Sequence, residues 1–390
     1  MTMRLRATEV PFDRLLVGGE AGISARQYAL LIQDLKRPST RFAEGPHVTF
    51  LQQYRSIGDR IFDRRAFEST PYFRNARACI DLTGRYFAAA REDQVVLIAK
   101  QFVDRYENRV NSAEFLPEIG QTSDGIPIVV QPVEFSRSYS VVDGNHRLAI
   151  EYMNGRSTAL VSTSGQAEIT PLQQMLGDVL WTRGSFELYQ PVDLPECRDR
   201  WVVVRKCTDR LAMIERVLRN IGLLEAGATF LDIGSYYGWF VHQMSRFGLD
   251  SYGIERDPIS AQIGTWAYGV RPQQILVGDC ARLLADHSRA YDVVSFQSIL
   301  HHFIINRSRC TPEELIRLVE GVTKRVLFFE TGQSHEAWFR RHLAEWTPDF
   351  IENWLKLNTR FARVIRVGVD EDAVGDYRRN YGRTLFACIR

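Results

Sequence analysis

Acidic residues and glycines recur at the ends of short apolar segments in the C-terminal half of the chain. The run Asp232-Ile-Gly234-Ser-Tyr-Tyr-Gly238 follows one such segment, and Glu255 follows the next, 23 positions after Asp232. Gly278 and Asp279 follow a third segment. Glycine lets a turn bend sharply and lets the backbone approach a ligand. The carboxylates are placed to orient a polar group (Asp232), to accept both hydroxyls of a ribose (Glu255) and to accept from an adenine amine (Asp279).

Two further apolar segments lead into residues that can move protons. One ends at Gln297 at the edge of the expected pocket, and Ser298-Ile-Leu-His301-His302 follows it. Imidazole exchanges protons near neutral pH, so His301 is a candidate base for a hydroxyl nucleophile, with packing as the alternative. For His302 we expect packing. Glu330 ends the other segment and could bind acceptor hydroxyls, act as a base or cap a helix.

Three arginines and two tyrosines gather between Asp376 and Arg383, just before the last apolar segment. A guanidinium cluster suits a phosphate or carboxylate on an acceptor. An exposed hairpin loop is the equally weighted alternative.

The N-terminal half contains one comparable motif, Asp143-Gly144-Asn145-His146-Arg147, between an apolar segment and a helical pattern. We expect Asn145 or Asp143 to cap the helix. The free N–H groups at the helix start, together with Arg147, would form a phosphate site. In the structural alternative, Asp143 caps the helix and His146 packs in the core.

The elements that must position the C-terminal residues alternate between strand and helix, which predicts an α/β fold with a mostly parallel sheet covered on both faces. The expected strands are 229–234, 251–256, 274–279, 291–297, 325–331, 363–369 and 383–389. Ligands of such a sheet bind beyond the carboxyl ends of the strands, where these acidic residues stand.

Upstream, residues 1–50 read as irregular, and apolar residues at helical spacing predict a helix over 92–107. Strands are expected at 126–134, 139–144 and 158–163, with a helix over 145–155. An amphipathic helix and a loop should fill 164–190, and a further helix 201–224.

The C-terminal residues resemble class I S-adenosylmethionine-dependent methyltransferases over roughly residues 225–390. The resemblance implies a doubly wound, seven-stranded sheet in which Asp232, Gly234 and Gly238 hold the amino-acid part of the cofactor. It also assigns Glu255 to the ribose and Asp279 to the adenine. A dinucleotide oxidoreductase is the competing interpretation, but it would require the first glycine of GxGxxG, which this loop lacks.

The N-terminal motif resembles the ParB/sulfiredoxin-like fold over about residues 85–165, a smaller α+β domain that uses ATP or CTP. The resemblance implies that Asp143, Gly144, Asn145, His146 and Arg147 bind a phosphate or nucleotide. Asn145 stands where a sulfiredoxin has its cysteine, so reductase activity is not expected. The expected division is this domain with an N-terminal extension over 1–165, connecting helices over 166–224 and the methyltransferase domain over 225–390.

The composition is that of a soluble globular protein, with 45% hydrophobic and 25% charged residues. A net charge of +2 creates no global field that would attract nucleic acid. The six cysteines lack zinc spacing, so we expect no metal and reduced thiols in a cytoplasmic protein. No signal peptide and no membrane-spanning run are found.

We therefore expect methyl transfer to an oxygen of a small molecule, sugar or glycan; the absence of an Asn/Asp-Pro-Pro-Tyr motif disfavours base-amine or amide-nitrogen acceptors. One alternative is a bifunctional enzyme that phosphorylates and methylates a glycan end. Another is a nucleotide-binding regulator whose methyltransferase fold only binds cofactor.

Overall fold

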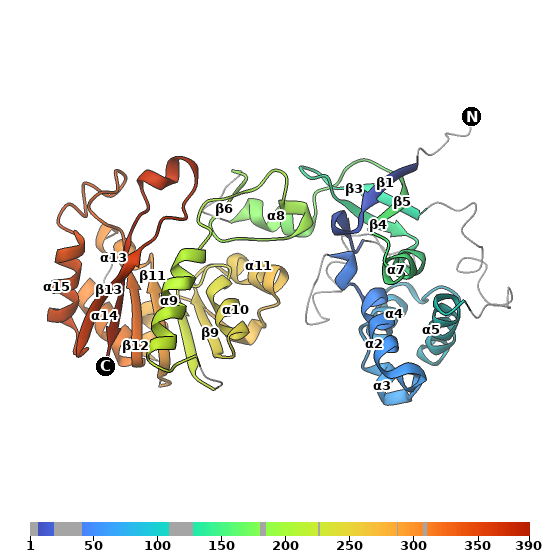
Figure 1. Ribbon diagram of the computed structural model, residues 1–390, viewed down its shortest axis with the longest axis horizontal. Helices are drawn as coiled ribbons and strands as arrows, with labels where there is room; N and C mark the ends of the chain where they lie inside the picture. Colours follow the sequence, from blue (N-terminus) through green and yellow to red (C-terminus); the bar gives the residue numbers. More distant parts are fainter. Residues whose placement is uncertain are drawn as a thin grey trace. The chain divides into compact units, whose positions relative to one another are not determined.

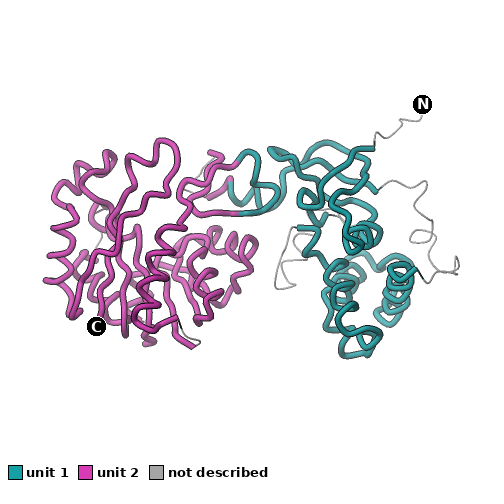
Figure 2. Tube along the Cα trace, in the orientation of Figure 1, with its two compact units in different colours: residues 1–176, 193–200 teal, residues 177–192, 201–390 magenta. Residues whose placement is uncertain are grey.

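The computed structural model describes residues 7–18, 41–108, 128–179, 185–224, 227–286, 288–306 and 310–390. The chain forms two compact units (Figure 2). Unit 1 comprises Met1–Leu176 and Asp193–Arg200, and unit 2 comprises Gly177–Val192 and Trp201–Arg390. The chain thus enters unit 2, returns briefly to unit 1 and enters unit 2 again.

Unit 2 is built on a seven-stranded sheet (Figure 1). In spatial order its strands are β10 (Ile275–Val277), β9 (Asp250–Glu255), β8 (Thr229–Ile233), β11 (Tyr291–Gln297), β12 (Thr323–Glu330), β14 (Thr384–Ile389) and β13 (Arg363–Val369). Among these, β14 alone runs antiparallel to its neighbours. The predicted α/β sheet is confirmed. From β8 the chain moves outward first to one side and then, at β11, to the other, so the switch point lies between β8 and β11.

Helices cover both faces of this sheet because successive strand residues point to opposite sides. Phe328 of β12 packs in one apolar cluster with α9 (Thr208–Asn220) and α10 (Trp239–Arg246), whereas its neighbour Phe329 packs in the other. The second cluster includes side chains of α12 (Cys280–Ala285), α13 (Leu300–Ile305), α14 (Pro312–Gly321) and α15 (Pro348–Asn358). α11 (Pro258–Tyr268) packs beside α10.

Short elements complete unit 2. The pair β6 (Glu187–Leu188) and β7 (Val202–Val203) forms a separate two-stranded parallel sheet. Two 3-10 turns, η5 (Pro272–Gln274) and η6 (Gly375–Arg379), precede β10 and β14. The helix expected over 201–224 is therefore shorter, because its first residues pair as β7.

Unit 1 contains a five-stranded mixed sheet. Its spatial order is β1 (Ala7–Pro11), β5 (Thr158–Thr163), β3 (Ile128–Pro132), β4 (Tyr139–Asp143) and β2 (Leu15–Leu16). The expectation of an irregular first 50 residues was wrong for β1 and β2. Only Val10 of β1 is buried, so the strand has no apolar alternation to reveal it, and it forms by pairing with the distant β5.

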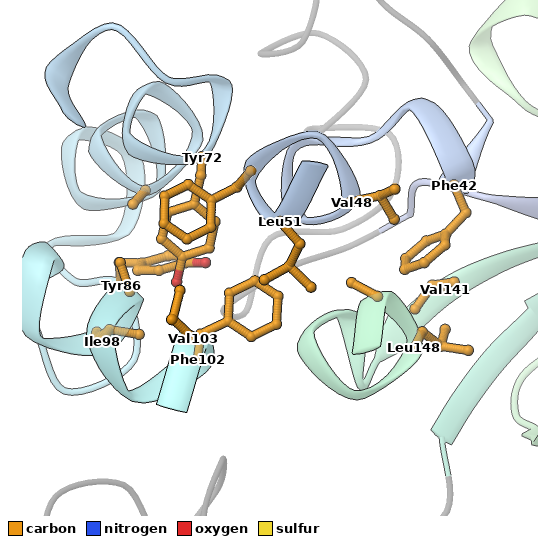
Figure 3. Close-up of a cluster of buried hydrophobic side chains, with 14 of the residues drawn as sticks. Phe42, Val48, Leu51, Tyr72, Tyr86, Ile98, Phe102, Val103, Val141 and Leu148 are labelled. Atoms are coloured by element: carbon orange, nitrogen blue, oxygen red, sulfur yellow. The ribbon is translucent and has the colours of Figure 1, made fainter. Parts of the chain in front are cut away.

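Helices pack against this sheet and against one another. They are α2 (Pro46–Ile57), α3 (Arg64–Glu68), α4 (Pro71–Thr83), α5 (Glu92–Tyr106), α7 (Asn145–Met153) and α8 (Pro171–Asp178), with 3-10 turns η1 (Phe12–Arg14), η2 (Phe42–Glu44), η3 (Gly58–Phe62) and η4 (Pro195–Cys197). Figure 3 shows the core that joins them, in which Leu51 of α2 lies between Phe102 of α5 and Val48. Of the described helices, none is long and apolar enough to cross a bilayer.

His146 lies in this core of unit 1. Its Nε2 is 2.8 Å from the Tyr72 hydroxyl, and its ring lies 4.5 Å from that of His47 and 4.6 Å from that of Phe102. Burial, followed by the nearby His47 and Arg105, lowers the pKa of His146 well below its usual 6.5. The core of unit 1 therefore requires a neutral imidazole.

Acidification should consequently weaken unit 1. A histidine whose pKa is depressed on folding binds more protons when unfolded, so its contribution is complete above pH 6.5 and is lost as pH falls below it. The loss is about 1.4 kcal/mol per pH unit. Denaturant unfolding at pH 7.5 and 5.5 should show this extra loss in the wild type but not in His146→Gln. Equal pH dependence in both proteins would contradict the assignment.

Candidate functional site

A cavity of about 370 Å³ opens in unit 2, with lining residues that follow β8, β9 and β11. It is lined by Tyr189, Gln190, Asp232, Gly234, Tyr236, Phe240, Glu255, Gln297, Ser298, Ile299, His301, His302, Trp338, Phe339, Tyr381 and Arg383. The cavity therefore occupies the switch point of the sheet, where ligands of such folds bind. Of the predicted site residues, it gathers Asp232, Gly234, Glu255, Gln297 and His301.

The turn after β8 holds backbone conformations that few residues adopt. Gly234 has φ of 78°, and a Cβ there would lie 2.2 Å from Cδ1 of Ile299. Tyr236 (φ 54°) and Ser298 (φ 60°) are also left-handed, although neither is glycine. Such strain persists only where the surroundings impose it, and it concentrates at functional sites. Both residues line the cavity.

Asp232 lines the cavity and is 3% exposed. Burial raises the pKa of its carboxyl to about 7, although a hydrogen bond from Ser295 and the nearby Arg210 act in the opposite direction. The carboxyl in the free site therefore takes up a proton much more readily than an ordinary aspartate. A cationic ligand group would favour its charged form.

Glu255 faces the same cavity from the end of β9. Its two carboxylate oxygens accept the backbone N–H groups of Tyr236 at 2.7 Å and of Asp257 at 2.8 Å. Burial raises its pKa despite these bonds. Each carboxylate oxygen can accept a second hydrogen bond, so Glu255 can hold the turn after β8 and still receive ligand hydroxyls.

Two predicted cofactor residues do not line the cavity. Asp279 is exposed and caps α12, its Oδ1 accepting the N–H of Arg282 at 3.0 Å. Gly238 is the N-cap residue of α10. Gln297 does line the cavity, and its Oε1 accepts from Arg210 at 3.2 Å.

The two histidines after β11 differ in what their rings bind. Nδ1 of His301 accepts the N–H of Gly332 at 3.2 Å, and burial lowers the pKa of this ring well below 6.5. The neutral ring therefore carries its proton on Nε2 and has no free basic nitrogen. Among the described residues, neither ring nitrogen of His302 has a hydrogen-bond partner, and the ring lines the cavity. His302 is exposed, but the protein atoms packed around its ring, followed by Arg383, lower its pKa and favour the neutral form.

Glu330, the other predicted catalytic residue, is fully buried beneath three arginines. Its carboxylate pairs with Arg383 at 2.8 Å, Arg205 at 3.2 Å and Arg210 at 3.5 Å. Burial alone would raise its pKa, but the three guanidinium groups outweigh that effect and hold it well below its usual value. A carboxylate this acidic is a poor proton acceptor. Its contacts are those of a carboxylate that holds buried arginines in place.

The three arginines between residues 376 and 383, for which an acceptor-binding cluster and an exposed loop were equal alternatives, differ in burial. Arg378 and Arg379 are exposed, whereas Arg383 is buried and donates to both carboxylate oxygens of Glu336, at 2.8 Å each. Arg383 also donates to Glu330 and to Oγ of Ser298. Its charge is therefore neutralised inside the protein, which the sequence alone did not indicate.

Sequence reasoning missed most of the aromatic wall of the cavity. Tyr236 and Tyr381 stood inside motifs already considered, but Tyr189, Trp338 and Phe339 did not. Trp338 is 45% exposed, and its ring lies 5.6 Å from that of Tyr381. An aromatic residue in a loop has no periodicity, so no local signal distinguishes it from a core residue.

In unit 1 the motif at residues 143–147 joins β4 to α7, as expected, but it is capped differently. The N-cap residue is Gly144 in the left-handed conformation (φ 101°), without a side-chain cap from Asp143 or Asn145. Asp143 is exposed and pairs with Arg147 at 3.4 Å. Since His146 lies in the core, it is not placed to contact a phosphate. The ParB/sulfiredoxin-like resemblance and the ATP or CTP site stay predictions.

The arrangement around the cavity suits an organic ligand. Within the described ranges, no group of three or more His, Cys, Asp or Glu side chains is arranged to hold a metal ion. Carboxylates from β8 and β9 line the cavity together with aromatic rings and two histidines. The site can thus hold a polar, partly cationic molecule beside a flat one.

Comparisons with known proteins agree with this description. Residues 207–356 match the family model described as a methyltransferase domain. The crystal structure of WbdD is 17% identical over 55% of this chain and 46% of that chain, with a TM-score of 0.43. Magnesium protoporphyrin IX methyltransferase (ChlM) from Synechocystis PCC 6803 with bound SAM is 18% identical over 47% of this chain and 78% of that chain, with a TM-score of 0.35.

The chain thus spans about half the length of the WbdD chain. WbdD is named a bifunctional kinase-methyltransferase in another of its structures. A search of curated proteins finds no match. The family match over residues 207–356, together with the strand order, therefore identifies a methyltransferase domain within unit 2.

Removing the Glu330 charge should destabilise unit 2 strongly. Glu330→Gln would leave three buried guanidinium groups short of a counter-ion, at a cost of about 3–5 kcal/mol. Glu352→Gln is the matched control. Glu352 likewise pairs with more than one cation, Lys356 and Arg366, but these ion pairs lie at the surface. Its cost should be about 0–1 kcal/mol. Denaturant unfolding measures both changes in the free energy of unfolding. Equal changes would show that the buried cluster stabilises unit 2 no more than a surface ion pair does.

Proposed function

We propose that unit 2 transfers the methyl group of S-adenosylmethionine to an oxygen atom of a small molecule, sugar or glycan. The observation that carries this proposal is the division of the cavity. Asp232 and Glu255 face it from β8 and β9, and the remaining wall combines aromatic rings with two histidines, Gln190, Gln297 and Arg383.

On the cofactor side, each residue has a distinct role. Asp232 pairs with the ammonium group of the methionine part, and Glu255 accepts the ribose hydroxyls. Gly234 and the turn that follows it let the backbone approach the ligand. Asp279 keeps one carboxylate oxygen beside its cap, so an adenine contact from it requires the free Oδ2.

On the acceptor side, aromatic rings dominate. Tyr381 lies between Trp338 and the guanidinium of Arg205, whose Cζ is 4.3 Å from the Tyr381 ring centroid. In the described part of the cavity lining, the only guanidinium is that of Arg383, which Glu336 and Glu330 neutralise. These features favour an uncharged acceptor with a flat face, as in a sugar or aromatic ring, over a phosphate or carboxylate.

The base we propose is His302 rather than His301. The Gly332 N–H occupies Nδ1 of His301, so this ring can donate a proton to a ligand but not accept one. His302 keeps a neutral ring at the cavity without a hydrogen-bond partner among the described residues. It can therefore receive the proton of an acceptor hydroxyl.

Different residues then have different roles in the reaction. Bound cofactor supplies an electrophilic methyl group on a sulfonium sulfur. The aromatic wall orients the acceptor oxygen in line with that methyl group and excludes water. With the cofactor bound, His302 would take the proton of the acceptor hydroxyl as its oxygen is methylated, which would yield a methyl ether and S-adenosylhomocysteine.

Cofactor binding should depend on pH through Asp232. Because the pKa of Asp232 is about 7, the free site is protonated in acid, and the cofactor's ammonium group must displace that proton. S-adenosylmethionine affinity should thus fall between pH 7.5 and 5.5, by about tenfold per pH unit below the pKa.

Calorimetry on the wild type, Asp232→Asn and Asp292→Asn tests this dependence. Asp232→Asn should bind weakly and without the pH slope. Asp292 is the control, because it lies at the opposite end of the sheet and accepts from Thr229. A wild type that does not bind S-adenosylmethionine at any pH would refute the proposed function.

Alanine substitutions of the two histidines should differ in their effect on turnover. With a panel of sugar and phenol acceptors, His302→Ala should lower turnover by about 10²–10⁴ while cofactor affinity stays unchanged. His301→Ala should instead lower the thermal midpoint, because it removes a buried hydrogen bond. If His301→Ala abolishes turnover and His302→Ala does not, the base is His301 and our assignment is wrong.

A further inference from the structure

Part of the cavity wall comes from outside the recognised domain. The family match begins at residue 207, yet Tyr189 and Gln190 line the cavity. They belong to residues Glu187–Val192, which we call the strap; these are the last residues of the chain's first passage through unit 2. Apart from Tyr381 and Arg383, which follow the match, the other lining residues lie within 207–356, so the contribution of the strap has to be found in its contacts.

Gln190 binds both ends of the turn that follows β8. It is 4% exposed, its Nε2 donates to the carbonyl of Ser235 at 3.2 Å, and its Oε1 accepts the N–H of Trp239 at 3.3 Å. Ser235 follows Gly234, and Trp239 opens α10. One amide group therefore spans the turn from its first residues to the helix that follows.

The same turn is also held by Glu255, which accepts the N–H of Tyr236. Side chains of both β9 and the strap thus bind the turn. Tyr236 has a left-handed backbone that surrounding contacts must maintain. Without Gln190, the turn loses two side-chain hydrogen bonds and keeps those to Glu255 and to the carbonyl of Ile254, which accepts the N–H groups of Gly234 and Ser235.

Tyr189 extends the strap to the other side of the switch point. Its ring lies 5.4 Å from that of Tyr236, and its hydroxyl donates to Oγ of Ser298 at 3.1 Å. Arg205 donates to the same tyrosine hydroxyl at 2.8 Å. The strap therefore bridges the loop after β8 and the loop after β11, on either side of the switch point.

Other contacts keep the strap in place within unit 2. β6 pairs with β7, and the hydroxyl of Tyr377 donates to Glu187 at 2.7 Å. The hydroxyl of Tyr268 in α11 donates to the carbonyl of Pro191. The strap is consequently held at both ends, with Tyr189 and Gln190 between them.

We propose that the strap completes the cofactor site and that Gln190 is a positioning residue, which sets the conformation of the 234–238 turn for S-adenosylmethionine. This inference rests on the proposed function, because it assigns the turn to the cofactor. Gln190 acts through the backbone of the turn and not through the reacting atoms.

The test uses the full chain and four proteins: the wild type, Gln190→Ala, Gln190→Glu and Gln274→Ala. Gln274 is the matched control, because it is also buried and its amide also bridges two backbone groups, the N–H of Arg271 and the carbonyl of Ser251. These groups lie away from the cavity. Both alanine variants should therefore lose similar thermal stability.

Only Gln190→Ala should also weaken binding of S-adenosylmethionine and S-adenosylhomocysteine, by about tenfold or more for two lost hydrogen bonds. It should speed hydrogen exchange at the Trp239 amide in the ligand-free protein, and Gln274→Ala should not. Gln190→Glu keeps the acceptor for Trp239 and loses the donor to Ser235, so its affinity should lie between those of the wild type and the alanine variant.

The outcomes separate this inference from the proposed function. If the wild type binds cofactor, Asp232→Asn does not, and Gln190→Ala binds as well as Gln274→Ala, the strap is only a structural cover and the inference is overturned. If the wild type itself fails to bind either compound, the proposed function fails first.

Discussion

The buried Glu330 carboxylate is the interaction on which the site of unit 2 depends most. It ends β12 and binds guanidinium groups from three places in the chain: Arg205 after β7, Arg210 in α9 and Arg383 before β14. Two of these arginines also hold Oγ of Ser298, at 2.9 Å each. A buried charge is costly unless it is paired, so the cluster must form as a whole. Once formed, it fixes the loop after β11 beside the cavity.

That cluster also explains how the two sides of the cavity differ in charge. Glu330 and Glu336 neutralise Arg383 where it meets the cavity, so the aromatic side presents no net positive charge there. Asp232 lies outside the cluster, and burial leaves its carboxyl with a raised pKa and ready for a cation. The same low-polarity interior therefore produces an inert ion cluster in one place and a responsive carboxyl in the other.

The strap connects the cavity of unit 2 to the part of the chain that precedes the family match. Tyr189 reaches Arg205 and Ser298, and Gln190 reaches the turn after β8, although the family match begins only at residue 207. Residues 193–200 then fold into unit 1, where Asp193 pairs with Arg41 and Asp199 with Arg14. The recognised domain and its neighbour are thus joined through a segment that also serves the cavity.

The amino-acid sequence by itself determined the α/β sheet and the position of Asp232, Glu255 and Gln297 at its carboxyl edge. Short apolar strands, separated by helix-length segments, can bury their faces only as such a sheet, and strand ends then meet at one edge. The tertiary structure alone decided which charged side chains are neutralised by an ion pair. Glu330 and Arg383 look reactive in sequence but neutralise each other, and His301 is buried with its Nδ1 bound by Gly332, whereas His302 is exposed. β1, Tyr189 and Gln190 likewise depend on partners far along the chain, which no local pattern can reveal.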